Sequence, residues 1–210
     1  AILFDIDGTL ADTLPVCVQA FQQTLKKIDG KDYSAEEITR YFGIAEKGIF
    51  QRMVAPQIVD DSLGIYYQTY AELHAQHCQL FSGIRELLNE VHASGLKMGV
   101  VTGRGASGAR LTLELLDILP YFDVVEHGSD VVMGKRDPLQ RALQALEVRP
   151  EATLYLGDMA SDMEESTSLG MWAAGAAWAS TASLHPNGWG DRAQVFTSVE
   201  TFRVWLRSAL

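Results

Sequence analysis

Short runs of apolar, β-branched residues alternate with segments of helical periodicity along most of this chain, and this alternation limits the possible folds more than any other feature. Five such runs predict strands, at residues 1–4, 96–101, 124–125, 153–156 and, more weakly, 171–177. Between them, Ile84, Leu87 and Val91 exemplify the apolar stripe of a helix. Buried strands separated by helices are typical of βαβ units. The expected fold class is therefore α/β, a Rossmann-like parallel sheet flanked by helices.

One long stretch, residues 14–81, interrupts the alternation and shows helical pattern alone. Within it, Ser34 and Glu37 have the spacing of a capping box that opens a helix. An all-helical segment of this length is too long to be a connection between one strand and the next helix. We therefore predict an inserted, all-helical cap domain over residues 14–81, and an α/β core domain made of residues 1–13 and 82–210.

The charge of the chain excludes several classes of partner. Seventeen Lys and Arg residues against 27 Asp and Glu give a formal net charge of −10. Such a surface repels phosphate backbones and anionic lipid, so neither a nucleic acid nor a membrane is an expected partner. The apolar runs are far shorter than the ~20 residues of a membrane span. With two cysteines and no apolar leader before Asp5, we expect a cytoplasmic protein.

Polar residues follow the ends of the predicted strands. In open parallel sheets, ligands bind outside the carboxyl ends of the strands, so residues that follow different strands meet at one edge. The residues concerned are Asp5 and Asp7 after the first strand, Thr102 and Gly103 after the second, Lys135 beyond the third, and Asp158 and Asp162 after the fourth. We expect all of them to converge.

The acidic members of this group predict a divalent metal site. Asp5 and Asp7 are two residues apart, so on a strand they point the same way. Neighbouring carboxylates in an apolar setting repel each other strongly unless a cation lies between them. Taken alone, Asp158 and Asp162 fit helix-capping acids as well as they fit metal ligands, but beside the first pair they are better interpreted as the rest of a ligand set. An oxygen-rich site without histidine suits Mg²⁺, which is the expected cofactor.

The turn that begins at Thr102 predicts an anion site. Its hydroxyl, the Gly103 amide and the dipole of the following helix all attract a phosphate, and the Lys135 ammonium adds a point charge. The segment from Gly103 to Gly108 also matches the G-x-G-x-x-G motif, with Glu126 near the position of the usual acid. Dinucleotide binding is therefore an alternative, although it leaves the four aspartates unexplained.

Together these motifs resemble those of the haloacid dehalogenase superfamily of phosphohydrolases, over nearly the whole chain. The helical insert is similar to the cap of its C1-capped members, and the phosphoglycolate-phosphatase-like branch is the most similar. The four motifs of the superfamily correspond to the D-x-D-G-T-L sequence at Asp5 to Leu10, to Thr102, to Lys135, and to the G-D-x-x-x-D sequence at Gly157 to Asp162.

The resemblance implies a Mg²⁺-dependent phosphatase that acts on a small phosphorylated metabolite. In this interpretation Asp5 is the nucleophile that forms an aspartyl-phosphate, while Asp7 protonates the leaving oxygen and then activates water. The implied metal ligands are Asp5, the Asp7 carbonyl, Asp158 and Asp162; the implied phosphate ligands are Thr102, Gly103 and Lys135; and the implied cap contacts to the organic group are Gly43 and Lys47.

Two other hypotheses use the same core residues. A phosphomutase of this architecture would share them. A phospho-accepting switch or binding protein would use Asp5 and Mg²⁺ without turnover, but receiver domains need only ~120 residues and have no use for a helical lid. The acid at Asp7 favours phosphoester hydrolysis over dehalogenation, because a departing halide needs no proton.

Overall fold

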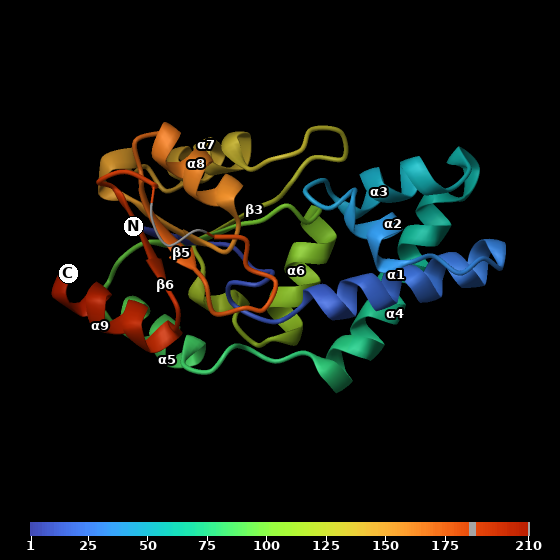
Figure 1. Cartoon of the computed structure of the whole chain (residues 1–210), viewed down its shortest axis with the longest axis horizontal. Coiled ribbons are helices and arrows are strands. Elements are labelled where there is room, and N and C mark those ends of the chain that lie inside the picture. The colour runs from blue at the N-terminus through green and yellow to red at the C-terminus, as the bar shows by residue number, and fades with distance from the viewer. Residues whose placement is uncertain (185–187, 210) are drawn as a thin grey trace.

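A parallel sheet forms the centre of the computed structural model, which describes residues 1–184 and 188–209 (Figure 1). Within those residues the strand order is β3-β2-β1-β4-β5-β6, and all neighbouring strands run parallel. The central strand β1 pairs with β2 on one side and with β4 on the other. The strands are β1 (Ile2–Phe4), β2 (Met98–Val101), β3 (Val124–Glu126), β4 (Leu154–Gly157), β5 (Trp172–Ala176) and β6 (Ala193–Phe196).

Helices cover both faces of this sheet, so consecutive residues of a strand enter different cores. Ile2 and Phe4 belong to a cluster with α5, α6 and α9, whereas Leu3 packs in a second cluster with α7. The core helices are α5 (Ile84–Ala93), α6 (Ala106–Leu115), α7 (Arg136–Ala145), α8 (Ala160–Ser168) and α9 (Val199–Ala209). The α/β class is confirmed, including a parallel sheet flanked by helices.

Each of the five predicted strands is present, and no strand end differs from the predicted one by more than two residues. Strand β6 was not predicted. It is a short edge strand of mixed polarity, in which Gln194 is exposed and Ala193 and Val195 are half-buried, so it lacks the continuous apolar run of a central strand.

A helical insertion between β1 and β2 forms a cap with its own apolar core. Phe21, Phe50 and Tyr66 lie at its centre, and the ring centroids of Phe21 and Tyr66 are 4.3 Å apart. The predicted capping box of Ser34 and Glu37 is present. The cap helices are α1 (Leu14–Asp29), α2 (Ala35–Thr39), α3 (Glu46–Met53) and α4 (Val59–His77).

The two connections between cap and core lie side by side. Ala11 and Leu80 form an antiparallel bridge, and the Phe81 amide donates to the Leu10 carbonyl at 3.0 Å. The outgoing and returning chains are therefore tied to each other at the point where the cap leaves the sheet. Among the helices of the described residues, none has the length and apolar character required to cross a bilayer.

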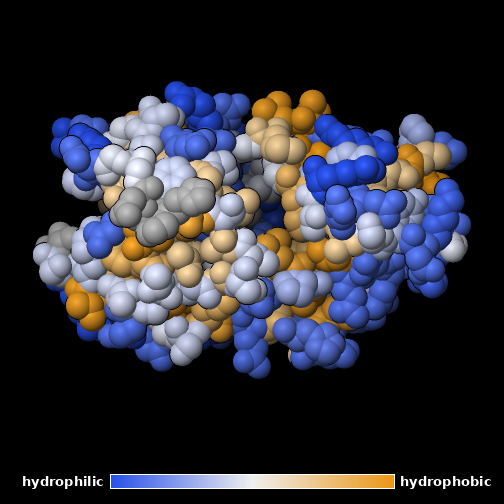
Figure 2. All heavy atoms as spheres, viewed as in Figure 1, coloured by the Kyte–Doolittle hydropathy of each residue, from blue (hydrophilic) through white to orange (hydrophobic). Residues whose placement is uncertain are grey.

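A loop after β3, residues 129–134, reaches from the core to the cap, as the path of the chain between β3 and α7 shows in Figure 1. The Ala45 amide donates to the Ser129 carbonyl at 2.9 Å, and Arg52 Nη1 donates to the Asp130 carbonyl at 3.1 Å. Figure 2 shows the surface hollowed where the core and the cap meet.

Candidate active site

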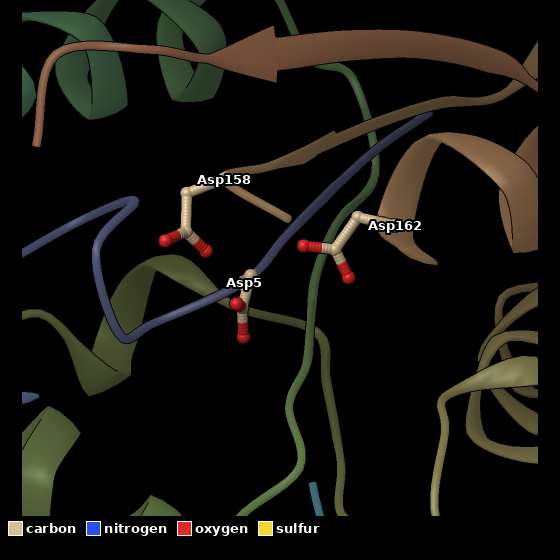
Figure 3. A group of neighbouring side chains, drawn as sticks. All are labelled: Asp5, Asp158 and Asp162. Carbon is tan, nitrogen blue, oxygen red and sulfur yellow. The ribbon is translucent and has the colours of Figure 1, made fainter. Parts of the chain in front are cut away.

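Three buried carboxylates from separate elements form the centre of the site (Figure 3). Asp5 follows β1, Asp158 follows β4, and Asp162 lies in the first turn of α8. One oxygen from each lies within 4.8 Å of the others, and each residue is at most 4% exposed. The predicted convergence of these three acids is therefore observed, and together they could hold a metal ion.

The register of the two central strands explains why these acids meet. Phe4 pairs with Leu156, so the residues that follow both strands leave the sheet at the same edge. Gly8 then turns the chain beneath Asp158 with a φ of +74°, and a Cβ atom at this position would collide with the Asp158 carboxylate. Glycine is required there by both the backbone conformation and the close approach.

Lys135 bridges two of the acids. Its Nζ atom lies 2.7 Å from Asp5 Oδ2 and 2.8 Å from Asp162 Oδ1, and 5.8 Å from the centroid of the Tyr155 ring. Burial by itself disfavours an ammonium group, but Asp162 and Asp5 outweigh it and raise the pKa of Lys135 well above its usual value. The predicted third-motif lysine is thus a charged member of the acid cluster.

Three acids share one lysine in this cluster, so the metal-free cluster disfavours having all three ionised at once. Burial raises the pKa of Asp5 to about 7 despite Lys135, and burial together with Asp5 raises the pKa of Asp158 to about 8. Asp5 Oδ1 and Asp158 Oδ2 are buried without a hydrogen-bond partner in the described part of the chain. Unpartnered carboxylate oxygens that face a common space are suitable ligands for a hard divalent cation.

The Asp7 carboxylate lies outside this cluster and binds Arg104 instead. Arg104 Nε donates to Asp7 Oδ2 at 2.9 Å, Nη2 donates to Oδ1 at 2.8 Å, and the Thr13 hydroxyl also donates to Oδ1. Burial favours the neutral acid, but these donors outweigh it and lower the pKa of Asp7. The Asp7 carboxylate is therefore a separate, ionised group outside the acid cluster. The role of the Asp7 backbone carbonyl as a metal ligand stays a prediction.

The predicted phosphate turn lies between the acid cluster and the cap. Thr102 is buried, and its Oγ1 accepts a hydrogen bond from the Arg104 amide at 3.3 Å. A Cβ atom added to Gly103 would lie 3.6 Å from the Cα atom of Gly43, so this predicted cap residue faces the turn. The roles of these residues as phosphate and substrate ligands stay predictions.

The features that favoured dinucleotide binding have other partners in this structure. The Gly105 amide, at the start of α6, donates to Glu46 Oε2 of the cap at 2.7 Å. Glu126 pairs with Arg141 at 2.6 Å. A side chain of the chain itself therefore occupies the turn where the pyrophosphate of a dinucleotide would bind.

Sequence reasoning missed the cap residue that reaches the core. Lys47, predicted as a substrate contact, pairs with Asp60 at 2.9 Å in this structure, and its side chain is 43% exposed. Its neighbour Glu46 is buried and lies against Arg104 and Gly105. The sequence around Glu46 gives no local sign of this contact. Arg104 is distant in sequence, and the two residues meet only because of how the cap docks on the core.

Comparisons with known proteins agree with the motifs. Residues 2–176 match the family of haloacid dehalogenase-like hydrolases. The pyrophosphatase PpaX of Bacillus mycoides (strain KBAB4) is 29% identical over 179 residues, which cover 84% of this chain and 83% of the relative.

Solved structures share the fold. CbbY from Rhodobacter sphaeroides, in complex with phosphate, has a TM-score of 0.78 at 23% identity and covers 94% of this chain and 93% of its own. A predicted phosphoglycolate phosphatase from Haemophilus somnus 129PT has a TM-score of 0.65 at 21% identity, with 83% of each chain covered. With the motifs in place at the sheet edge and the family match spanning most of its length, the chain belongs to the haloacid dehalogenase-like hydrolases and is an enzyme of this phosphatase-type family.

Proposed function

We propose that the chain is a Mg²⁺-dependent phosphatase that hydrolyses a small organic phosphate monoester through an aspartyl-phosphate on Asp5. The observation that carries this proposal is the division of the acids into two groups. Asp5 lies with Asp158 and Asp162 in a cluster suited to a cation, whereas Asp7 has its own donors, Arg104 and Thr13. This division supports a role for Asp5 in nucleophilic attack and a role for Asp7 in proton transfer.

The proposed reaction has two steps. In the first, an Asp5 carboxylate oxygen attacks phosphorus and the bond from phosphorus to the leaving oxygen breaks. Asp7, which its donors hold ionised in the metal-free chain, must take up a proton before this step, and it gives that proton to the leaving oxygen. In the second, Asp7 removes a proton from water, which attacks the same phosphorus; inorganic phosphate leaves and the Asp5 carboxylate is restored. The Thr102 hydroxyl, the Gly103 amide and the Lys135 ammonium would stabilise the charge on the transferring group.

Mg²⁺, held by Asp5, Asp158, Asp162 and the Asp7 carbonyl, would supply electrostatic neutralisation of the phosphoryl oxygens. The cluster fits this ion because its donors are hard oxygens, two of which lack another partner among the described residues. The same ion would keep Asp5 ionised, which the metal-free cluster disfavours.

The relatives narrow the choice of substrates to test. The PpaX name denotes a pyrophosphatase, and CbbY was solved with phosphate and, as a variant, with xylulose-(1,5)bisphosphate. We therefore propose a small phosphorylated metabolite, with pyrophosphate, sugar phosphates and phosphoglycolate as the first compounds of a panel. The free thiols of Cys17 and Cys78 agree with the cytoplasmic location expected from the sequence.

The proposal is tested by hydrolysis of p-nitrophenyl phosphate by the full chain. Activity should require Mg²⁺, disappear with EDTA, return when Mg²⁺ is added in excess, and fall to background in Asp5→Asn. Hydroxylamine added during turnover should trap the aspartyl-phosphate as a hydroxamate on Asp5, detected by mass spectrometry of peptides.

Asp32→Asn is the matched control, because it removes one carboxylate whose side chain is 82% exposed. Its activity should equal that of the original chain. Turnover that survives chelation or the loss of the Asp5 carboxylate would contradict the mechanism. Stoichiometric phosphorylation that is stable over minutes, without release of phosphate, would indicate a switch rather than a phosphatase.

A further inference from the structure

A buried arginine connects the proposed proton donor of the core to three helices of the cap. Arg104 lies in the loop between β2 and α6, and its side chain is 5% exposed. In addition to its bidentate contact with Asp7, Nη2 donates to Cys17 Sγ of α1 at 2.7 Å and to Tyr70 Oη of α4 at 3.1 Å. The guanidinium carbon also lies 4.8 Å from the centroid of the Tyr70 ring. The position of this core side chain therefore depends on the cap.

The third cap contact of Arg104 is an ionic one to Glu46 of α3. Arg104 Nη1 lies 3.7 Å from Glu46 Oε1, and neither atom has a hydrogen-bond partner in the described part of the chain. Glu46 Oε2 is fixed by the Gly105 amide, and a Cβ atom at Gly108 would collide with the Glu46 carboxylate. The first turn of α6 is thus shaped to receive this cap side chain, whose charge faces the guanidinium.

The contacts to Asp7 leave its two oxygens in different situations. Oδ1 accepts from Thr13 and from Arg104 Nη2, whereas Oδ2 has Arg104 Nε at 2.9 Å as its donor among the described residues. A bidentate guanidinium fixes the plane of a carboxylate as well as its position. Oδ2 is therefore the oxygen with capacity left to carry a proton, and Arg104 determines where that oxygen points.

We propose that Arg104 is a positioning residue, which aligns Asp7 for proton transfer to the leaving group when Glu46 and Tyr70 of the docked cap hold its guanidinium. This inference rests on the proposed function, in which Asp7 is the proton donor. If the cap moves away, Arg104 loses its contacts to Cys17, Glu46 and Tyr70, and Asp7 is no longer fixed by a constrained partner. Proton donation is thereby confined to the closed arrangement of cap and core.

The test compares two substrates of similar shape that differ in their need for a proton. Phenolate is a poor leaving group and p-nitrophenolate a good one, so the ratio of kcat/KM for p-nitrophenyl phosphate over phenyl phosphate measures the loss of acid catalysis. A positioned acid contributes about 100-fold or more. We expect Arg104→Ala to raise this ratio by at least about 10-fold, and Asp7→Asn to raise it further.

Two further variants test the path from the cap. Glu46→Gln removes the charge that faces Arg104, and it should raise the ratio in the same direction by a smaller factor. Arg104→Lys keeps the charge but loses the bidentate geometry, and its ratio should lie between those of the original chain and Arg104→Ala. If circular dichroism shows that Arg104→Ala does not fold, the ratios of Glu46→Gln and Arg104→Lys test the positioning role of Arg104 in its place.

Asp32→Asn is the control, because the Asp32 side chain lies on the surface of the cap, is 82% exposed and pairs with Lys26 without touching Arg104 or Asp7. It should leave both kcat/KM values and their ratio unchanged. An unchanged or lowered ratio in the Arg104 variants, with a raised ratio in Asp7→Asn, would overturn the inference and leave the proposed function standing. An unchanged ratio in Asp7→Asn would overturn the proton-donor role itself.

Discussion

Replacing Asp158 by Asn should stabilise the metal-free protein, and the stabilisation should grow with pH. Burial and the neighbouring Asp5 carboxylate raise the pKa of Asp158 to about 8 in the folded chain, against about 3.9 in an unfolded chain. Between these values the folded state keeps a proton that the unfolded state has lost. The free energy of unfolding of the metal-free protein therefore falls as pH rises through this window, and it levels off above about pH 8.

The size of this effect follows from the proton that only the folded chain keeps. For one such group, each pH unit between the two pKa values lowers the free energy of unfolding by about 1.4 kcal/mol. From pH 5 to pH 7, the stability of Asp158→Asn relative to the original chain should therefore increase by about 3 kcal/mol. For a domain of this size, such a change corresponds to a relative shift in Tm of about 6 to 12 °C.

The assay is thermal unfolding in EDTA at pH 5, 6 and 7, followed by the same series with increasing Mg²⁺. Adding Mg²⁺ should reverse the order of stability, because the ion binds the folded original chain and the variant lacks one ligand. At a concentration one hundred times Kd, binding adds ~2.7 kcal/mol to the original chain. Asp32→Asn again serves as the exposed control, with no change in its stability relative to the original chain between pH 5 and pH 7.

Two results would refute this reasoning. The first is a difference in Tm between Asp158→Asn and the original chain that is the same at every pH in EDTA. That result would mean that burial and Asp5 do not raise the pKa of Asp158. The second is equal stabilisation of both proteins by Mg²⁺, which would place the cation elsewhere.

Two other substitutions test the same cluster. Lys135→Met removes the ammonium between Asp5 and Asp162. It should lower the free energy of unfolding, measured in urea with EDTA, by about 3–5 kcal/mol, as expected for a broken buried ion pair. A decrease below about 1 kcal/mol would contradict the burial of this pair. Gly8→Ala places a Cβ atom against the Asp158 carboxylate. The increase in Tm on adding Mg²⁺ should therefore be smaller than in the original chain, while the far-UV circular dichroism spectrum stays unchanged. An increase in Tm equal to that of the original chain would show that the turn can relax around the added methyl group.

The sheet and its acidic edge were predictable because the signals for them are local. Apolar runs mark the strands, and in a parallel sheet the residues that follow each run must meet at the carboxyl edge. Asp5, Asp158 and Asp162 could therefore be placed together without knowledge of any contact. Strand β6 was not predicted because an exposed edge strand needs fewer apolar residues, so its sequence resembles that of a loop.

The partners of Asp7 were not predictable in the same way. The contact between Arg104 and Glu46 joins residues 58 positions apart, on two units whose relative placement no periodicity encodes. The family resemblance implied Gly43 and Lys47 as cap contacts, but the orientation of α3 determines which neighbouring side chain points toward the core. Glu46 does so here, while Lys47 pairs with Asp60 on the cap.

The paired connections at Ala11 and Leu80 have a consequence for how the cap can move. Because the outgoing and returning segments are hydrogen-bonded to each other, a movement of the cap must bend both segments together. The outgoing segment reaches this bridge at Ala11, six residues after Asp5, so the bend would lie close to the proposed nucleophile. A bend at this point would carry Glu46 and Tyr70 together, and with them two of the partners of Arg104.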